Sequence, residues 1–148
     1  MIGIRGATTV AANVPSDIRR ATREVLDGLL ERNGIGPDDL VACLFTVTPD
    51  LNALYPSTVA REAPGWERVP LLDMAQAVGP IGPALCIRVL LLAQSDKRAD
   101  QVVHLYLHGA GQLRPDLAYA SEEGSTANGC DHECGGDGRG DRGGRRTS

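Results

Sequence analysis

An arginine stands in the middle of an apolar run at residues 86–94, which read CIRVLLLAQ. Apart from Arg88 the run is typical of a buried strand. A buried charge that has lost its partner costs roughly 3–5 kcal/mol. Arg88 must therefore meet either a carboxylate of the chain itself or an anion from outside. In the second case it is a candidate group for binding or catalysis.

Side chains of a strand alternate between its two faces, and this rule sorts the residues around Arg88. One face carries Cys86, Arg88, Leu90 and Leu92, and the other carries Ile87, Val89, Leu91 and Ala93. The same rule groups Gly3, Arg5 and Ala7, and it groups His104 with Tyr106. Arg5, Arg88 and Tyr106 are then predicted to share one concave face, with Arg61 and Arg114 at the edges of elements. The alternation fits equally well a protein whose arginines pair with its 19 acidic residues.

The spacing of apolar residues predicts one long helix among several strands. Residues 1–9, 40–48, 69–72, 84–93 and 102–107 read as strands, and residues 56–63 as a short helical turn that Ser57 caps. The long helix is predicted to start at Ser16 or Asp17 after Pro15 and to stop at Gly34. This order indicates an α+β domain, a mixed sheet with one long helix on one face. The other face needs a cover, for which we expect self-association.

The composition changes near residue 118. Residues 118–148 contain no Val, Ile, Leu, Met, Phe or Trp, and eight of these 31 residues are glycine. Such a segment cannot offset its ordering entropy by burying apolar surface. We therefore predict a folded domain at residues 1–117 and a disordered tail at residues 118–148.

Several function classes are disfavoured by the composition. A net charge of −4 gives no general attraction to nucleic acid. The chain shows neither a membrane span nor a signal peptide, so we expect a cytoplasmic protein. Cys43 and Cys86 lie in apolar runs and read as reduced core thiols. The tail offers only Cys130, His132 and Cys134 as irregularly spaced soft ligands, so no metal site is predicted.

Seven blocks of the sequence, in order and in register, resemble one enzyme family. They are IRGATT at 4–9, TPDLNALYP at 48–56, VARE at 59–62, GWERVP at 65–70, CIRV at 86–89, HLYL at 104–107 and LRPDL at 113–117. This pattern resembles the monofunctional chorismate mutases of the trimeric AroH type. The resemblance implies a homotrimer that forms a pseudo-α/β-barrel, with an active site in each cleft between subunits.

The implied reaction is the rearrangement of chorismate to prephenate, a step toward phenylalanine and tyrosine that needs no metal or cofactor. A protein contributes by holding the reactive conformer and by placing fixed charges where the transition state becomes polar. Arg88 resembles the arginine that binds a substrate carboxylate and the ether oxygen. Arg5 and Tyr106 resemble the residues that hold the side-chain carboxylate. The rim of the cleft is expected to comprise Tyr55, Arg61, Leu113 and Arg114.

The segment PLLDMAQ at residues 70–76 departs from the family pattern, which usually has cysteine where Asp73 stands and glutamate where Gln76 stands. That glutamate places a negative charge near the ring, whereas Gln76 is neutral. Our hypothesis is that Asp73 has taken over the carboxylate role and is catalytic together with Arg88, Arg5 and Tyr106. The alternative is that Asp73 pairs with a neighbouring arginine. From this segment the predicted substrate-binding residues are Leu72, Asp73, Met74, Ala75 and Gln76.

Two other functions stay open at this point. The first is an imine or enamine hydrolase of the related trimeric fold, which also holds a carboxylate with an arginine between subunits. The second is a non-enzymatic trimer whose tail binds metal or nucleic acid.

Overall fold

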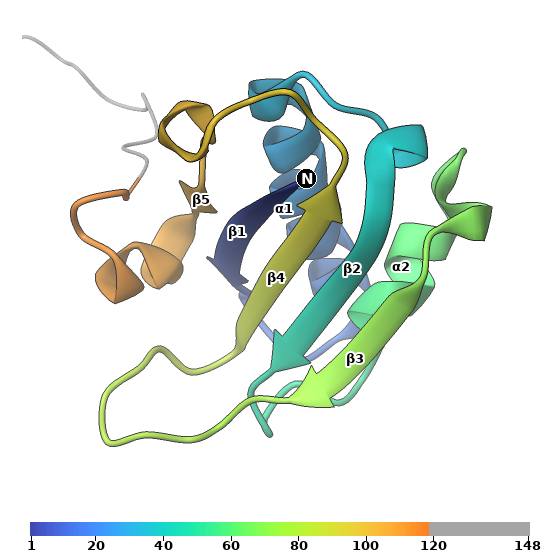
Figure 1. Ribbon diagram of the computed structural model, residues 1–148. Helices are drawn as coiled ribbons and strands as arrows, with labels where there is room; N and C mark the ends of the chain where they lie inside the picture. Colours follow the sequence, from blue (N-terminus) through green and yellow to red (C-terminus); the bar gives the residue numbers. More distant parts are fainter. Residues whose placement is uncertain (119–148) are drawn as a thin grey trace, which may run out of the picture.

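A five-stranded mixed sheet with one long helix on one face forms the part of the chain that the computed structural model describes, residues 1–118 (Figure 1). The strand order is β3-β2-β4-β1-β5. β4 runs antiparallel to both of its neighbours, and β3 and β5 run parallel to the strands that they extend. The elements are β1 (Ile2–Thr9), α1 (Pro15–Asn33), β2 (Leu40–Val47), α2 (Pro56–Arg61), β3 (Leu71–Ala75), β4 (Cys86–Ala93) and β5 (Leu105–Tyr106). This confirms the predicted α+β class.

The apolar stripe of α1 packs against the sheet. Ile18, Val25 and Leu29 follow the helical period and are fully buried. The helix begins one or two residues earlier than predicted, because Pro15 fits the first helical position and needs no N–H partner there. Gly34 ends the helix in the left-handed conformation, as predicted, with φ 60° and ψ 41°.

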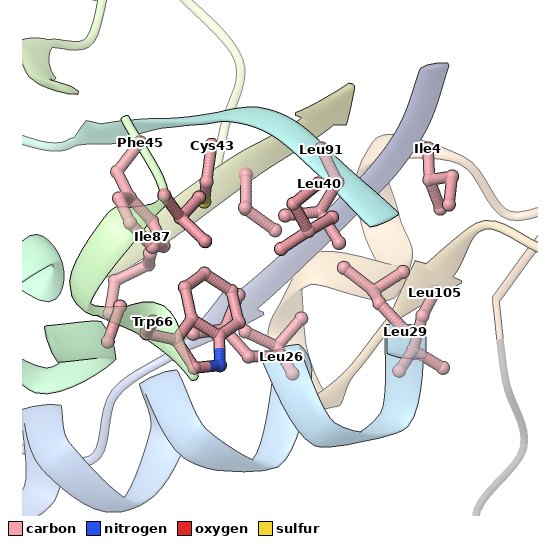
Figure 2. Packing of buried hydrophobic residues seen from close by; sticks show 14 of the residues in the cluster. Ile4, Leu26, Leu29, Leu40, Cys43, Phe45, Trp66, Ile87, Leu91 and Leu105 are labelled. Atoms are coloured by element: carbon pink, nitrogen blue, oxygen red, sulfur yellow. The ribbon is translucent and has the colours of Figure 1, made fainter. Parts of the chain in front are cut away.

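One hydrophobic core fills the space between α1 and the sheet. Figure 2 shows apolar side chains of β1, β2 and β4 meeting Leu26 and Leu29 of α1, with Trp66 closing the cluster. On β4 the helix-facing residues Ile87, Val89, Leu91 and Ala93 are buried, and Cys86 on the other side of the strand is buried as well. Arg88, Leu90 and Leu92 point to the opposite side, so the predicted sorting of β4 into two faces is confirmed.

Gly6 lets α1 approach the sheet closely. A Cβ atom at this position would lie 2.6 Å from Leu29 Cδ1 and 2.9 Å from Val89 Cγ1. Both distances are far below van der Waals contact, so only a residue without a side chain fits here. Gly3, on the opposite face of β1, would bring a Cβ no closer than 3.8 Å to any side chain.

Three predicted elements have different bounds. β3 spans Leu71–Ala75 rather than 69–72, because Val69 still closes a 3-10 turn. β4 starts at Cys86, since Leu85 has a φ of 50° and interrupts the strand. α2 ends at Arg61, and Ser57 does not cap it, because Pro56 already occupies its first position.

The strand predicted at 102–107 is shorter in the structure, where only Leu105–Tyr106 forms β5. The residues before β5 are held by hydrogen bonds from side chains. The buried Asn33 accepts from the Val103 N–H at 2.9 Å and donates to the Val103 carbonyl at 2.8 Å. The next residue, His104, accepts the Arg5 N–H on Nδ1 at 3.1 Å. Two side chains thus take the place of main-chain pairing before β5 begins.

The face of the sheet away from α1 is open and largely apolar. Leu72, Met74 and Leu90 on β3 and β4 are 53%, 38% and 36% exposed. A face of this kind on a folded chain indicates a contact surface. None of the helices in the described residues is long and apolar enough to cross a membrane.

Gly6→Ala is expected to lower the free energy of unfolding by about 1–3 kcal/mol, because the added methyl group forces Leu29 and Val89 apart. Urea denaturation at fixed protein concentration measures the change. Gly3→Ala is the matched control and should leave the midpoint nearly unchanged. Equal effects of the two substitutions would contradict the close approach of α1 at Gly6.

The His104 contact predicts a pH dependence of stability. Burial, together with the positive charges of Arg5 and Arg114, lowers the pKa of His104. The unfolded chain therefore takes up this proton first, at a pH of about 6.5, and folding stability is lost as the pH falls below that value. We expect His104→Asn, which keeps an acceptor but does not titrate, to flatten the decline in thermal midpoint between about pH 7 and 5. Parallel curves for the two proteins would contradict this role.

Candidate active site

The strand register places the predicted arginine site in one row across the open face. Arg88 pairs with Thr46 of β2 on one side and with Ala7 of β1 on the other. Ala7 in turn pairs with Tyr106, and Thr46 pairs with Met74. Directly opposed residues of neighbouring strands point to the same face. The row therefore brings together side chains from all five strands.

A cavity of about 460 Å³ lies over this row. We call it the Arg88 cavity. Six of the predicted site residues line it, namely Arg5, Met74, Arg88, Tyr106, Leu113 and Arg114. Its volume lies in the range of small-molecule sites, which is roughly 300–1,000 Å³.

Arg88 reaches the cavity with a side-chain hydrogen bond to the Cys86 thiol and with one donor unsatisfied. Its Nε atom is buried and has no hydrogen-bond partner in the described part of the chain. No carboxylate among residues 1–118 forms an ion pair with it, so this part of the chain gives no support to an internal ion pair. A buried guanidinium donor that is left unsatisfied favours an anion from outside.

The remaining arginines differ in how they are neutralised. Asp116 accepts two hydrogen bonds from Arg114, at 2.9 and 2.7 Å, and these bonds hold the pKa of Asp116 below its usual range. Asp116 thus neutralises Arg114 and fixes its orientation at the edge of the cavity. Arg5 and Arg61 make no ion pair with other described residues. Among the described residues, Arg5 and Arg88 are therefore the cations that line the cavity without an ion pair to a carboxylate.

A second group of predicted site residues does not line the Arg88 cavity of its own chain. It comprises Tyr55, Arg61, Leu72, Asp73, Ala75 and Gln76. Tyr55 and Arg61 stand exposed at the two ends of α2. Gln76 lines a smaller hollow of about 210 Å³ that Arg88 also borders. The structure thus gathers residues of β1, β3, β4 and β5 around Arg88, and it leaves Tyr55 and Arg61 of α2 apart from them.

Asp73 lies on the helix side of the sheet. It pairs in register with the fully buried Phe45, whereas its neighbour Met74 points to the Arg88 cavity. Its Oδ1 accepts the Ser57 N–H at 3.1 Å. Its charge, after burial, helps to raise the pKa of the Cys43 thiol. Within one chain the sheet therefore stands between Asp73 and the Arg88 cavity.

Thr46 belongs to the site although sequence reasoning missed it. It lines the Arg88 cavity, and its hydroxyl donates to Gln76 Oε1 at 3.3 Å. The alternation of residues 40–48 puts Thr46 on the open face. Its place opposite Arg88 follows only from the pairing of β2 with β4, which no local pattern encodes.

Cys43 and Cys86 are free and buried, as predicted. Burial raises the pKa of both thiols, which argues against a nucleophilic role. The candidate metal ligands Cys130, His132 and Cys134, and all of the predicted tail apart from Ala118, lie outside the described residues.

The family comparison matches nearly the whole described chain. A family model described as chorismate mutase type I matches residues 1–117. The chain is 40% identical over 116 residues to the chorismate mutase AroH of Bacillus subtilis (strain 168), covering 78% of this chain and 91% of that protein. It is 46% identical over 119 residues to the chorismate mutase AroH of Thermus thermophilus, covering 80% and 97%.

A solved structure resembles the fold as well. The chorismate mutase from Clostridium thermocellum superimposes with a TM-score of 0.72 at 38% sequence identity, covering 76% of this chain and 99% of that one. The matched region contains every strand of the sheet and both predicted parts of the site. The chain therefore belongs to the chorismate mutase type I family.

Proposed function

We propose that this chorismate mutase binds chorismate in the Arg88 cavity and rearranges it there to prephenate. The observation that carries the proposal is the buried Arg88 Nε, which has no hydrogen-bond partner among the described residues and lines the cavity. Chorismate is a dianion with an ether oxygen. It can supply the acceptors that the protein leaves out. The family comparisons favour this activity over the imine hydrolase and the non-enzymatic trimer.

The reaction exchanges one bond for another within a single molecule. The C–O bond of the enolpyruvyl ether breaks while a C–C bond forms to the ring, and no atom enters or leaves. The ether oxygen gains negative character as the bond breaks. Arg88 stabilises that charge in the transition state more than in the bound substrate, so it lowers the barrier and does not merely increase affinity.

Arg5 and Tyr106 hold the substrate in its reactive conformer. Arg5 lies near the row that carries Arg88 and Tyr106, because it neighbours Gly6 and Ala7 on β1. A guanidinium and a phenol on one side of the cavity suit a carboxylate. Binding of the side-chain carboxylate at this point restricts the rotation that keeps chorismate extended, which removes part of the entropic barrier.

A homotrimer completes the site in this proposal. The open apolar face of β3 and β4 needs a cover, and a second copy of the chain offers one. The α2 part of the predicted site, with Tyr55 and Arg61, then faces the Arg88 cavity of the neighbouring subunit. This arrangement explains why those residues do not line the cavity of their own chain.

Arg88→Lys is expected to lower kcat for chorismate on the order of 100-fold or more with a much smaller change in KM, because one ammonium cannot hold two oxygens in a planar fork. Loss of chorismate absorbance in the absence of any second reactant measures the rate and tests the activity itself. Arg98→Lys, at an exposed arginine paired with Asp100, is the control and should leave both constants unchanged. A kcat of Arg88→Lys near that of the wild type would refute the proposed role of Arg88.

Mixing two inactive variants tests whether subunits share the site. Arg88→Ala removes the cation of the β4 part, and Arg61→Glu places a negative charge at the α2 rim, where it repels the dianionic substrate. In a mixed trimer, one site in three takes its β4 part from a chain that keeps Arg88 and its α2 part from a chain that keeps Arg61. We expect activity to return after the two variants are unfolded and refolded together, and to stay absent after each is refolded alone. No recovery in trimers shown to be mixed would mean that one chain supplies both parts.

A further inference from the structure

The first turn of α2 lacks a cap of its own. Tyr55 precedes the helix and makes no side-chain capping bond. Pro56 has no N–H, and the amides of Thr58 and Val59 bond back to the Tyr55 carbonyl at 3.0 and 3.4 Å. The amide of Ser57 is the donor left over, and a helix start needs an acceptor for such a group.

Asp73 supplies that acceptor from another element. Its Oδ1 lies 3.1 Å from the Ser57 nitrogen, across 16 positions of sequence. Asp73 makes no ion pair with the other described residues, so the expected pairing with an arginine is also absent from this part of the chain. The amide of Ser57 is thus the polar contact that fixes its carboxylate.

The opposite end of α2 is fixed by ion pairs. Glu62 directly follows the helix and accepts from Arg19 at 3.0 and 2.9 Å and from Arg23 at 2.9 Å. α2 is therefore bonded to β3 at its second residue and to α1 just after its last residue. Tyr55 and Arg61, which are predicted to form the rim, stand beside these two ties.

We propose that Asp73 is a positioning residue that caps α2 and so holds Tyr55 and Arg61 at the mouth of the neighbouring subunit's cavity. This inference rests on the proposed function, and it replaces the hypothesis that Asp73 is the carboxylate of the reaction. Asp73 contributes a side chain long enough to place a hydrogen-bond acceptor at the Ser57 amide. Its negative charge is not required.

Asparagine and alanine separate the acceptor from the charge. Asp73→Asn keeps Oδ1 and removes the charge, so kcat and KM should stay within about twofold of the wild type. Asp73→Ala removes both, and KM for chorismate should rise about 3- to 10-fold while kcat changes much less, since rim contacts act mainly on binding. Asp73→Cys, which lacks a strong acceptor, gives a second truncation should the alanine variant not fold. Asp17→Asn, in the first turn of α1, is the matched control and should change neither constant.

Hydrogen exchange of the Ser57 amide gives a readout that does not depend on activity. We expect protection in the wild type and in Asp73→Asn, and faster exchange in Asp73→Ala and Asp73→Cys. A fall of kcat in Asp73→Asn as large as in Asp73→Ala would overturn the inference, because the charge would then act in the reaction. An unchanged KM in Asp73→Ala would overturn it as well. A wild type that leaves chorismate unchanged would refute the proposed function instead, and the exchange of Ser57 would still test the cap.

Discussion

A guanidinium without a counter-ion among residues 1–118 is the constraint on which the rest of the site depends. Arg88 sits in a strand whose other side chains are apolar, and its Nε finds no acceptor in residues 1–118. Such a group persists only if the favourable packing around it exceeds the desolvation penalty. The penalty falls when an anion binds. In the proposed function, folding and ligand binding are therefore coupled at this side chain, because the substrate supplies the acceptor that the described residues do not.

One face of the sheet contributes to folding stability, and the other face carries the proposed binding site. One face meets α1 closely enough that Gly6 has no room for a Cβ, and the buried residues of β4 complete the core there. The other face carries the row from Met74 to Tyr106 and keeps apolar residues exposed. A strand alternates between the two environments at every residue. Ile87 and Val89 thus stabilise the domain, while Arg88 between them is available for chemistry.

Local patterns predicted much of this from the sequence, and pairing between distant strands accounts for what they missed. The period of α1, the stop at Gly34 and the two faces of β4 are local signals, and the structure confirms them. The place of Thr46 opposite Arg88 depends on the pairing of two residues 42 positions apart. The hypothesis for Asp73 rests on how residues 70–76 depart from the family pattern. The pairing of β3 with β2 places its side chain on the helix side, with Phe45.

The Arg88 cavity carries positive but no negative side chains among the described residues, so the proposed function requires more of Arg88. No aspartate or glutamate among the described residues lines the Arg88 cavity, and Asp73 is occupied with Ser57 behind the sheet. Thr46 donates to the oxygen of Gln76, so the amide group left free is a donor rather than an acceptor. Such a residue can bind a ring hydroxyl, but it gives no negative charge to the ring as that ring becomes positive. Under the proposed function, the transition state is then stabilised mainly where negative charge gathers, at the ether oxygen.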